Sequence, residues 1–163
     1  MLKVGAEAPP LREKTTRGAV FDLSRQRGRI VVVYFFRKAF TRNCTVETKG
    51  FRDNYADLRA IGAEVVGVSC DSFDTQCRFA TQYEVSFPMI ADTDRAISRA
   101  YDVFFPILTV SHRVTYVIDP AGFVAGVFNH EFAVSRHLDE VLRFVHELAT
   151  GRRLGTRPPP GKR

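Results

Sequence analysis

Apolar positions follow two spacings along the chain, and together they predict alternating strands and helices. Residues 30–36 form an unbroken apolar run, IVVVYFF, which is typical of a strand at the centre of a sheet covered on both faces. From residue 44 to residue 61, apolar side chains instead recur every three or four positions, which predicts an amphipathic helix that Gly62 ends. This part of the chain therefore indicates a buried strand followed by a helix.

The rest of the chain continues this alternation. The other predicted strands are short apolar runs, at residues 19–23, 64–69, 87–90, 113–118 and 123–128. The other predicted helices lie at residues 72–83, 96–103 and 133–148. The sequence DPAG between the last two strands predicts a hairpin, and either Asp71 or Ser72 can cap the helix at 72–83. This order predicts an α/β fold with a mixed central sheet flanked by helices.

Composition indicates a folded chain with a basic end. Of the 163 residues, 45% are hydrophobic and 26% are charged, which is close to the averages of globular domains. The net charge of +6 lies mainly in residues 151–163, which contain five basic side chains and no acidic one. This Pro- and Gly-rich stretch has no aromatic residue to stack on bases, which favours a disordered tail over a nucleic-acid arm. We expect one domain over residues 1–150, followed by the tail.

No segment of the sequence predicts membrane insertion or secretion. The longest unbroken apolar run, residues 30–36, is much shorter than the roughly 20 residues of a membrane-spanning helix. Residues 1–14 lack the apolar core of a secretory signal. We therefore expect a cytoplasmic protein with no membrane partner and no nucleic-acid partner.

The three cysteines, Cys44, Cys70 and Cys77, indicate reactive or packing roles rather than a structural framework. Their odd number and the lack of a Cys-x-x-Cys pair disfavour structural disulfides and a zinc site. The four histidines show no paired ligand spacing and are expected at surface or structural positions: His112, His130, His137 and His146. We therefore predict no metal and no cofactor.

Cys44 has the context of a reactive thiol. It follows Thr41, between the buried strand and the predicted helix. A helix N-terminus offers unpaired backbone N–H groups and partial positive charge, and both stabilise a thiolate, the form of cysteine that attacks peroxide. Basic residues of the same stretch add positive charge: Arg37, Lys38, Arg42, Lys49 and Arg52. Cys44 is therefore the predicted nucleophile, whereas an inert packing role is the leading interpretation for Cys70 and Cys77.

Residues 37–44, RKAFTRNC, resemble the active-site pattern Pro-x-x-x-Thr-x-x-Cys of the peroxiredoxins, the alkyl hydroperoxide reductase/thiol-specific antioxidant superfamily. Thr45 and Glu47 match the continuation of this pattern in the bacterioferritin-comigratory type. Residues 113–119, RVTYVID, are similar to the segment that carries the family's catalytic arginine. The resemblance covers about residues 4–149, and its Thr, Cys and Arg set is more specific than a single short motif.

This resemblance implies a thioredoxin-like fold and a thiol-dependent peroxidase. Cys44 would reduce hydrogen peroxide and organic hydroperoxides and become a sulfenic acid. Arg113 would stabilise the thiolate and the peroxide oxygens, Thr41 would hydrogen-bond the peroxide, and Glu47 would orient an arginine. The implied partners are a hydroperoxide and thioredoxin or another thiol reductant, for a monomer or a homodimer.

The sequence departs from the family's pattern at two positions. Arg37 replaces the proline that shapes the active-site loop and shields the cysteine, which affects the rate more than the reaction type. Lys49 stands where many relatives carry a resolving cysteine. Others carry it at the position of Ala80, and Cys77 lies one helical turn earlier, so Cys77 is the candidate resolving cysteine. Two alternatives remain: Cys70 is the resolving cysteine, or Cys44 works without a resolving cysteine and an external thiol reduces it.

Other functions are weighed against this one. The leading alternative is a thioredoxin-like redox-sensing or binding module with little turnover, which the missing proline permits. A disulfide reductase is disfavoured because the second active-site cysteine is absent, and a nucleic-acid module ranks last.

Overall fold

The structure, a computed structural model, describes residues 1–107, 110–129 and 133–151. A five-stranded sheet with the order β5-β4-β3-β8-β9 forms its centre. The strands are β3 (Ile30–Phe35), β4 (Ala63–Ser69), β5 (Met89–Ala91), β8 (Val114–Ile118) and β9 (Val124–Asn129). β3, β4 and β5 are parallel, whereas β8 is antiparallel to both β3 and β9. The sheet is mixed, and the predicted hairpin is formed by β8 and β9.

β3 lies at the centre of this sheet and is buried along its whole length. Successive side chains of a strand point to opposite faces. Val32 and Tyr34 accordingly join one apolar cluster, and Val33 and Phe35 join a second. The unbroken apolar run exists because this strand contributes to two cores at once.

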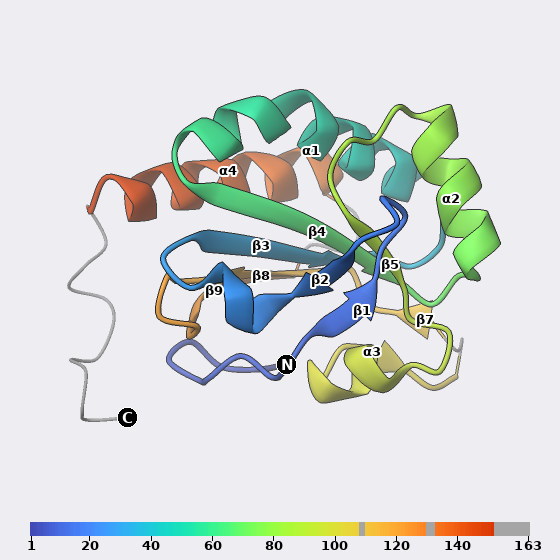
Figure 1. The fold of residues 1–163 in the computed structure, drawn as a ribbon, viewed down its shortest axis with the longest axis horizontal. Helices are drawn as coiled ribbons and strands as arrows, with labels where there is room; N and C mark the ends of the chain where they lie inside the picture. The colour runs from blue at the N-terminus through green and yellow to red at the C-terminus, as the bar shows by residue number, and fades with distance from the viewer. Residues whose placement is uncertain (108–109, 130–132, 152–163) are drawn as a thin grey trace.

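Helices cover both faces of the sheet. They are α1 (Arg42–Ala60), α2 (Phe73–Gln82), α3 (Ala96–Ala100) and α4 (Val134–Ala149). Figure 1 shows α1 and α4 on one face and α3 on the other. Phe51 of α1 and Val141 of α4 accordingly belong to the first cluster, whereas Tyr101, just after α3, belongs to the second. Within the described ranges, none of these helices is long and apolar enough to cross a bilayer.

Several elements are too short for their apolar residues to show the spacing of a strand or a helix in the sequence. β1 (Arg12–Lys14) is fully exposed and pairs with β2 (Val20–Asp22) in a separate two-stranded sheet, so the strand expected at 19–23 is not an edge of the central sheet. A 3-10 turn, η1 (Leu23–Gln26), and the paired strands β6 (Phe104–Phe105) and β7 (Val110–Ser111) were not predicted. Of the predicted tail, only Gly151 lies within the described residues.

The strand register brings distant segments to one end of the sheet. Phe35, the last residue of β3, pairs with Val114, the first residue of the antiparallel strand β8. Arg113 therefore lies at the same end of the sheet as the loop that leads from β3 into α1. β4 is parallel to β3, so the turn between β4 and α2 also lies at this end.

Candidate active site

Cys44 is the third residue of α1 and is buried, with 1% of its surface exposed. It therefore lies in the first helical turn, where backbone N–H groups have no helical acceptor and the helix dipole is positive. This turn contains no acidic residue and begins with Arg42. The position favours negative charge on the sulfur.

Arg113 is buried beside this sulfur, with 2% of its surface exposed. Its Nη2 donates a hydrogen bond to Cys44 Sγ at 3.4 Å, and its Nη1 donates to Glu47 Oε1 at 2.8 Å. Burial lowers the pKa of the guanidinium, but the Glu47 carboxylate and the Cys44 sulfur raise it, and the resulting pKa lies above its ordinary value. Arg113 is therefore a permanent positive charge in contact with the thiol.

Glu47 lies one turn after Cys44 on α1 and is completely buried. Residues three apart on a helix share a face, so the carboxylate and the thiol both meet Arg113. A buried carboxylate carries a large desolvation cost, which a close and well-aligned cation offsets. The 2.8 Å ion pair between Glu47 and Arg113 is such a contact, and it holds Nη1 while Nη2 of the same guanidinium donates to the sulfur.

Two polar residues that sequence reasoning did not assign to the site extend this cluster. His137 of α4 is completely buried, and its Nε2 lies 3.3 Å from Glu47 Oε2 and 2.7 Å from Oγ1 of Thr115. Thr115, on β8, is also completely buried. His137 lies four residues before Val141 and continues the buried stripe of α4, which was the available sequence signal that it is not on the surface.

Thr41 precedes α1 in an extended conformation and is exposed. Its hydroxyl donates a hydrogen bond to the Lys38 carbonyl at 2.7 Å and makes no cap on the helix. Because the hydroxyl hydrogen is used in this way, its oxygen presents lone pairs that accept hydrogen bonds. Thr41 therefore offers an acceptor three residues before Cys44.

The loop before α1 is tied to the end of β4 and to α2. The backbone N–H of Ala39 donates to Asp71 Oδ2 at 2.8 Å, and the Ser69 hydroxyl donates to the same oxygen at 2.6 Å. Ser69 Oγ in turn accepts from Gln76 Nε2 at 2.8 Å. Of the two predicted caps of α2, Ser72 is the one that caps the helix. Asp71 instead accepts the hydrogen bond from Ala39 in the loop before α1.

Aromatic residues line the same loop. Phe35 and Phe36 are buried in the two cores, whereas Phe40 is 41% exposed and has a left-handed backbone with φ of 67°. The Phe40 ring packs edge-on against Phe79 of α2, with 5.1 Å between the ring centroids. Arg37, where the family's pattern has proline, is half-buried.

No disulfide joins the three cysteines. Cys77 lies on α2 and is half-buried. Unlike Arg113, it is not in contact with the Cys44 sulfur in the structure. Ala80, one turn later, belongs to the same apolar cluster as Cys44. Cys70 is half-buried after β4, with Sγ 3.7 Å from Ser98 Oγ.

Comparisons with known proteins decide the family. Residues 4–127 match the AhpC/TSA family. The chain belongs to this family. It is 35% identical to the chloroplastic peroxiredoxin Q of Sedum lineare over 145 residues, which cover 88% of this chain and 78% of that protein. It is 34% identical over 154 residues to peroxiredoxin Bcp of Escherichia coli (strain K12), covering 91% of this chain and 98% of that protein. The crystal structure of peroxidoxin BcpB from Mycobacterium tuberculosis matches with a TM-score of 0.83 at 26% identity, over 91% of this chain and 99% of that one.

The chain is thus a peroxiredoxin of the bacterioferritin-comigratory type, with a thioredoxin-like fold and thiol-dependent peroxidase activity. The predicted family, fold class and enzyme class are confirmed, and a sensing module with little turnover is not favoured. As a peroxiredoxin, it acts on a peroxide and requires a thiol reductant.

Proposed function

We propose that Cys44 is the residue at which this peroxiredoxin reduces hydrogen peroxide and organic hydroperoxides, and that Arg113, Thr41 and Glu47 assist it. One observation carries the proposal: Arg113 Nη2 donates to Cys44 Sγ at 3.4 Å in a buried site, while Nη1 of the same guanidinium is held by Glu47. A fixed cation in a water-poor site stabilises a thiolate more than the same cation would in water.

The reaction at Cys44 is a displacement on oxygen. The thiolate attacks the terminal oxygen of the hydroperoxide, a sulfur–oxygen bond forms and the oxygen–oxygen bond breaks. Sulfur is oxidised by two electrons to a sulfenic acid, and the departing alkoxide or hydroxide takes a proton to become an alcohol or water. Arg113 stabilises the negative charge that moves from sulfur to oxygen.

Thr41 is proposed to orient the peroxide. Its hydroxyl hydrogen is donated to the Lys38 carbonyl, so its oxygen accepts the peroxide O–H and turns the terminal oxygen toward Cys44. Glu47 does not act as a base in this proposal. Its paired carboxylate fixes the plane of the Arg113 guanidinium.

Cys77 is proposed as the resolving cysteine, which condenses with the sulfenic acid to give a disulfide and water. Support comes from its place on α2, one turn before Ala80, which packs in the same cluster as Cys44. Cys44 is buried in the first turn of α1. Either this turn or the part of α2 that carries Cys77 must therefore open before the two sulfurs meet. Resolution by Cys70 or by an external thiol is the competing route.

Peptide mass spectrometry after an equimolar dose of peroxide separates these routes. A disulfide between Cys44 and Cys77 that disappears in Cys77→Ser and persists in Cys70→Ser supports the proposal. A persistent sulfenic acid at Cys44, or a disulfide with Cys70, overturns the role of Cys77.

A peroxide-consumption assay tests Cys44 itself, with thioredoxin or dithiothreitol as reductant. We expect turnover in the wild type and none in Cys44→Ser. Turnover that survives in Cys44→Ser would overturn the assignment of the nucleophile, and a wild type without turnover would favour the sensing module.

The proposal extends to the partner and the setting of the enzyme. Thioredoxin or another dithiol reduces the disulfide, and the chain acts in the cytoplasm as a monomer or a homodimer, with residues 1–150 as its catalytic domain. Light scattering coupled to gel filtration measures the oligomeric state directly.

A further inference from the structure

The buried polar cluster does not end at the pair of Glu47 and Arg113. It continues to His137 on α4, whose Nε2 lies 3.3 Å from Glu47 Oε2, and to Thr115 on β8, whose Oγ1 lies 2.7 Å from the same nitrogen. All of these side chains are at most 2% exposed. Arg113, just before β8, and His137 of α4 therefore both contact the buried carboxylate that α1 provides, and Thr115 of β8 contacts the His137 ring.

The two oxygens of Glu47 have different partners. Oε1 accepts from Arg113 Nη1 at 2.8 Å, and Oε2 faces His137. The last torsion of a glutamate side chain is broad, so a contact to one oxygen leaves the carboxylate plane loosely defined. His137 Nε2, 3.3 Å from Oε2, restricts this torsion on the second side, and with it the direction in which Arg113 presents Nη2 to Cys44.

We propose that His137 is a positioning residue of the peroxidase site: through Glu47 it sets the orientation of the Arg113 guanidinium that donates to the Cys44 sulfur. Thr115 holds the imidazole ring in place. This inference rests on the proposed roles of Cys44 and Arg113, and it assigns a functional task to α4 in addition to covering one face of the sheet.

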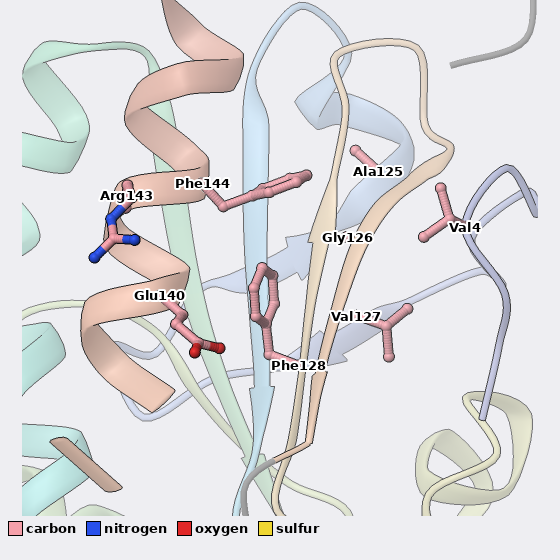
Figure 2. Close-up of a pocket in the computed structure, with 8 residues that line it drawn as sticks. All are labelled: Val4, Ala125, Gly126, Val127, Phe128, Glu140, Arg143 and Phe144. Atoms are coloured by element: carbon pink, nitrogen blue, oxygen red, sulfur yellow. The ribbon is translucent and has the colours of Figure 1, made fainter. Parts of the chain in front are cut away.

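The packing of α4 makes such a task physically reasonable, because the helix is held on two sides. A Cβ at Gly50 of α1 would overlap the Leu138 side chain, so α1 and α4 approach closely beside His137. On the other side, a Cβ at Gly126 of β9 would lie 2.9 Å from the Phe144 ring. Figure 2 shows Phe144 projecting from α4 over Gly126, at a groove of about 500 Å³ that none of the proposed site residues lines.

The test measures the state of Cys44 separately from turnover. The pH dependence of Cys44 alkylation by iodoacetamide, followed by peptide mass spectrometry, reports the thiolate at this one position. We expect His137→Leu to move the midpoint of this profile up by about one pH unit, equivalent to a tenfold weaker preference for the thiolate. The second-order rate constant for hydrogen peroxide is expected to fall by about tenfold as well, since the rate depends steeply on the placement of a catalytic group.

Three further variants complete the experiment. His137→Gln retains an amide nitrogen that can donate to Glu47 Oε2, so it is expected to keep the wild-type midpoint to a greater degree than His137→Leu. His146→Gln, an exposed position of the same helix, is the matched control and should change neither value. Thr115→Val removes only the hydroxyl that faces the ring and should shift the midpoint in the same direction by a smaller amount.

A folded His137→Leu with the wild-type midpoint would overturn the inference. If His137→Leu does not fold, a wild-type midpoint in Thr115→Val overturns it instead. The alkylation profile tests this inference even if the wild type consumes no peroxide. A wild type without peroxide consumption would count against the proposed function and not against the role of His137.

Discussion

Arg113 contacts Cys44 and Glu47 with two nitrogens of one planar guanidinium, a geometry that lysine does not have. We expect Arg113→Lys to lower the second-order rate constant for hydrogen peroxide by about 100-fold or more, the typical cost of losing one preorganised donor. The ammonium group of lysine can contact either the Glu47 carboxylate or the Cys44 sulfur, but it cannot bind both through two donors in one plane. Rapid-mixing kinetics with peroxide as the varied substrate measures this change.

The exposed Arg29 provides the matched control, because Arg29→Lys makes the same substitution outside the site. Its rate should equal that of the wild type. If Arg113→Lys keeps a rate within severalfold of the wild type, positive charge alone is sufficient and the fork geometry has no catalytic role.

Arg37 is the residue at which this peroxiredoxin departs from the sequence pattern of its family. Arg37→Pro is expected to raise the rate constant for hydrogen peroxide severalfold, because a proline ring fixes φ and stiffens the loop that shields Cys44. Arg37→Ala removes the same charge without adding a ring, and it should not reproduce the gain. An unchanged or lower rate in Arg37→Pro would contradict this expectation.

At the scale of residues, the sequence predicts candidate site residues best where they lie in one short segment. Thr41, Cys44 and Glu47 lie in one short segment, residues 41–47, that follows a buried strand, so a motif points to them. Arg113 was recognised only by resemblance, because nothing in its local sequence predicts a buried arginine. His137 was not assigned to the site, since its contact with Glu47 depends on how α4 packs against α1.

Gly67 lies in β4 directly opposite Tyr34 of β3, and this pair shows how strand sequence and packing are linked. A Cβ at Gly67 would lie 2.8 Å from three atoms of the Tyr34 side chain, two ring carbons and the hydroxyl oxygen. The ring is completely buried, and its hydroxyl bonds to Thr48 at 3.1 Å, so it has little room to move. We expect Gly67→Ala to reduce the free energy of unfolding by about 1–3 kcal/mol, as overpacking does in well-packed cores.

Urea unfolding of a double-mutant cycle with Tyr34→Leu measures this clash. The cost of Gly67→Ala should shrink when the ring is absent, because the two changes then share a contact. Equal costs in both backgrounds would mean that the Tyr34 ring is not what excludes a side chain at Gly67.

At the scale of elements, a clear hydrophobic period decided what could be predicted. The strands of the central sheet and the helices α1, α2, α3 and α4 were all expected. Each buries an apolar run or stripe except the short helix α3, whose buried residue is Ser98. β1 was not, because its three residues are exposed and are held by pairing with β2 rather than by burial. The predicted end of α3 was too late: the helix stops at Ala100 and Tyr101 turns into the second core instead.

At the scale of the whole molecule, the sheet separates two cores, and buried tyrosines lie in both. Tyr34 belongs to the first core, whereas Tyr101 and Tyr116 belong to the second. Burial raises the pKa of each of these hydroxyls, because a phenolate is poorly solvated in an apolar interior. The fold is therefore expected to lose stability in alkali as these hydroxyls lose their protons.

Tyr116 makes this expectation quantitative. Burial is the main reason that its pKa is raised from 10.0 to about 12. Below pH 10 the hydroxyl is protonated in the folded and the unfolded chain, so its contribution to stability is fully present. Above pH 10 the unfolded chain releases the proton while the folded chain keeps it, and stability falls until the pH passes about 12, by about 3 kcal/mol in total.

Tyr116→Phe removes this titration while keeping the ring. The variant should be less stable by about 1 kcal/mol at neutral pH, because the hydrogen bond of the Tyr116 hydroxyl to the Tyr101 carbonyl is lost. Its stability should then decline less steeply than that of the wild type as the pH rises, so the two curves converge in alkali. Urea unfolding at a series of pH values from about 8 to about 11 follows both proteins across the ordinary tyrosine titration. Parallel curves would place the alkaline sensitivity of this fold in other groups.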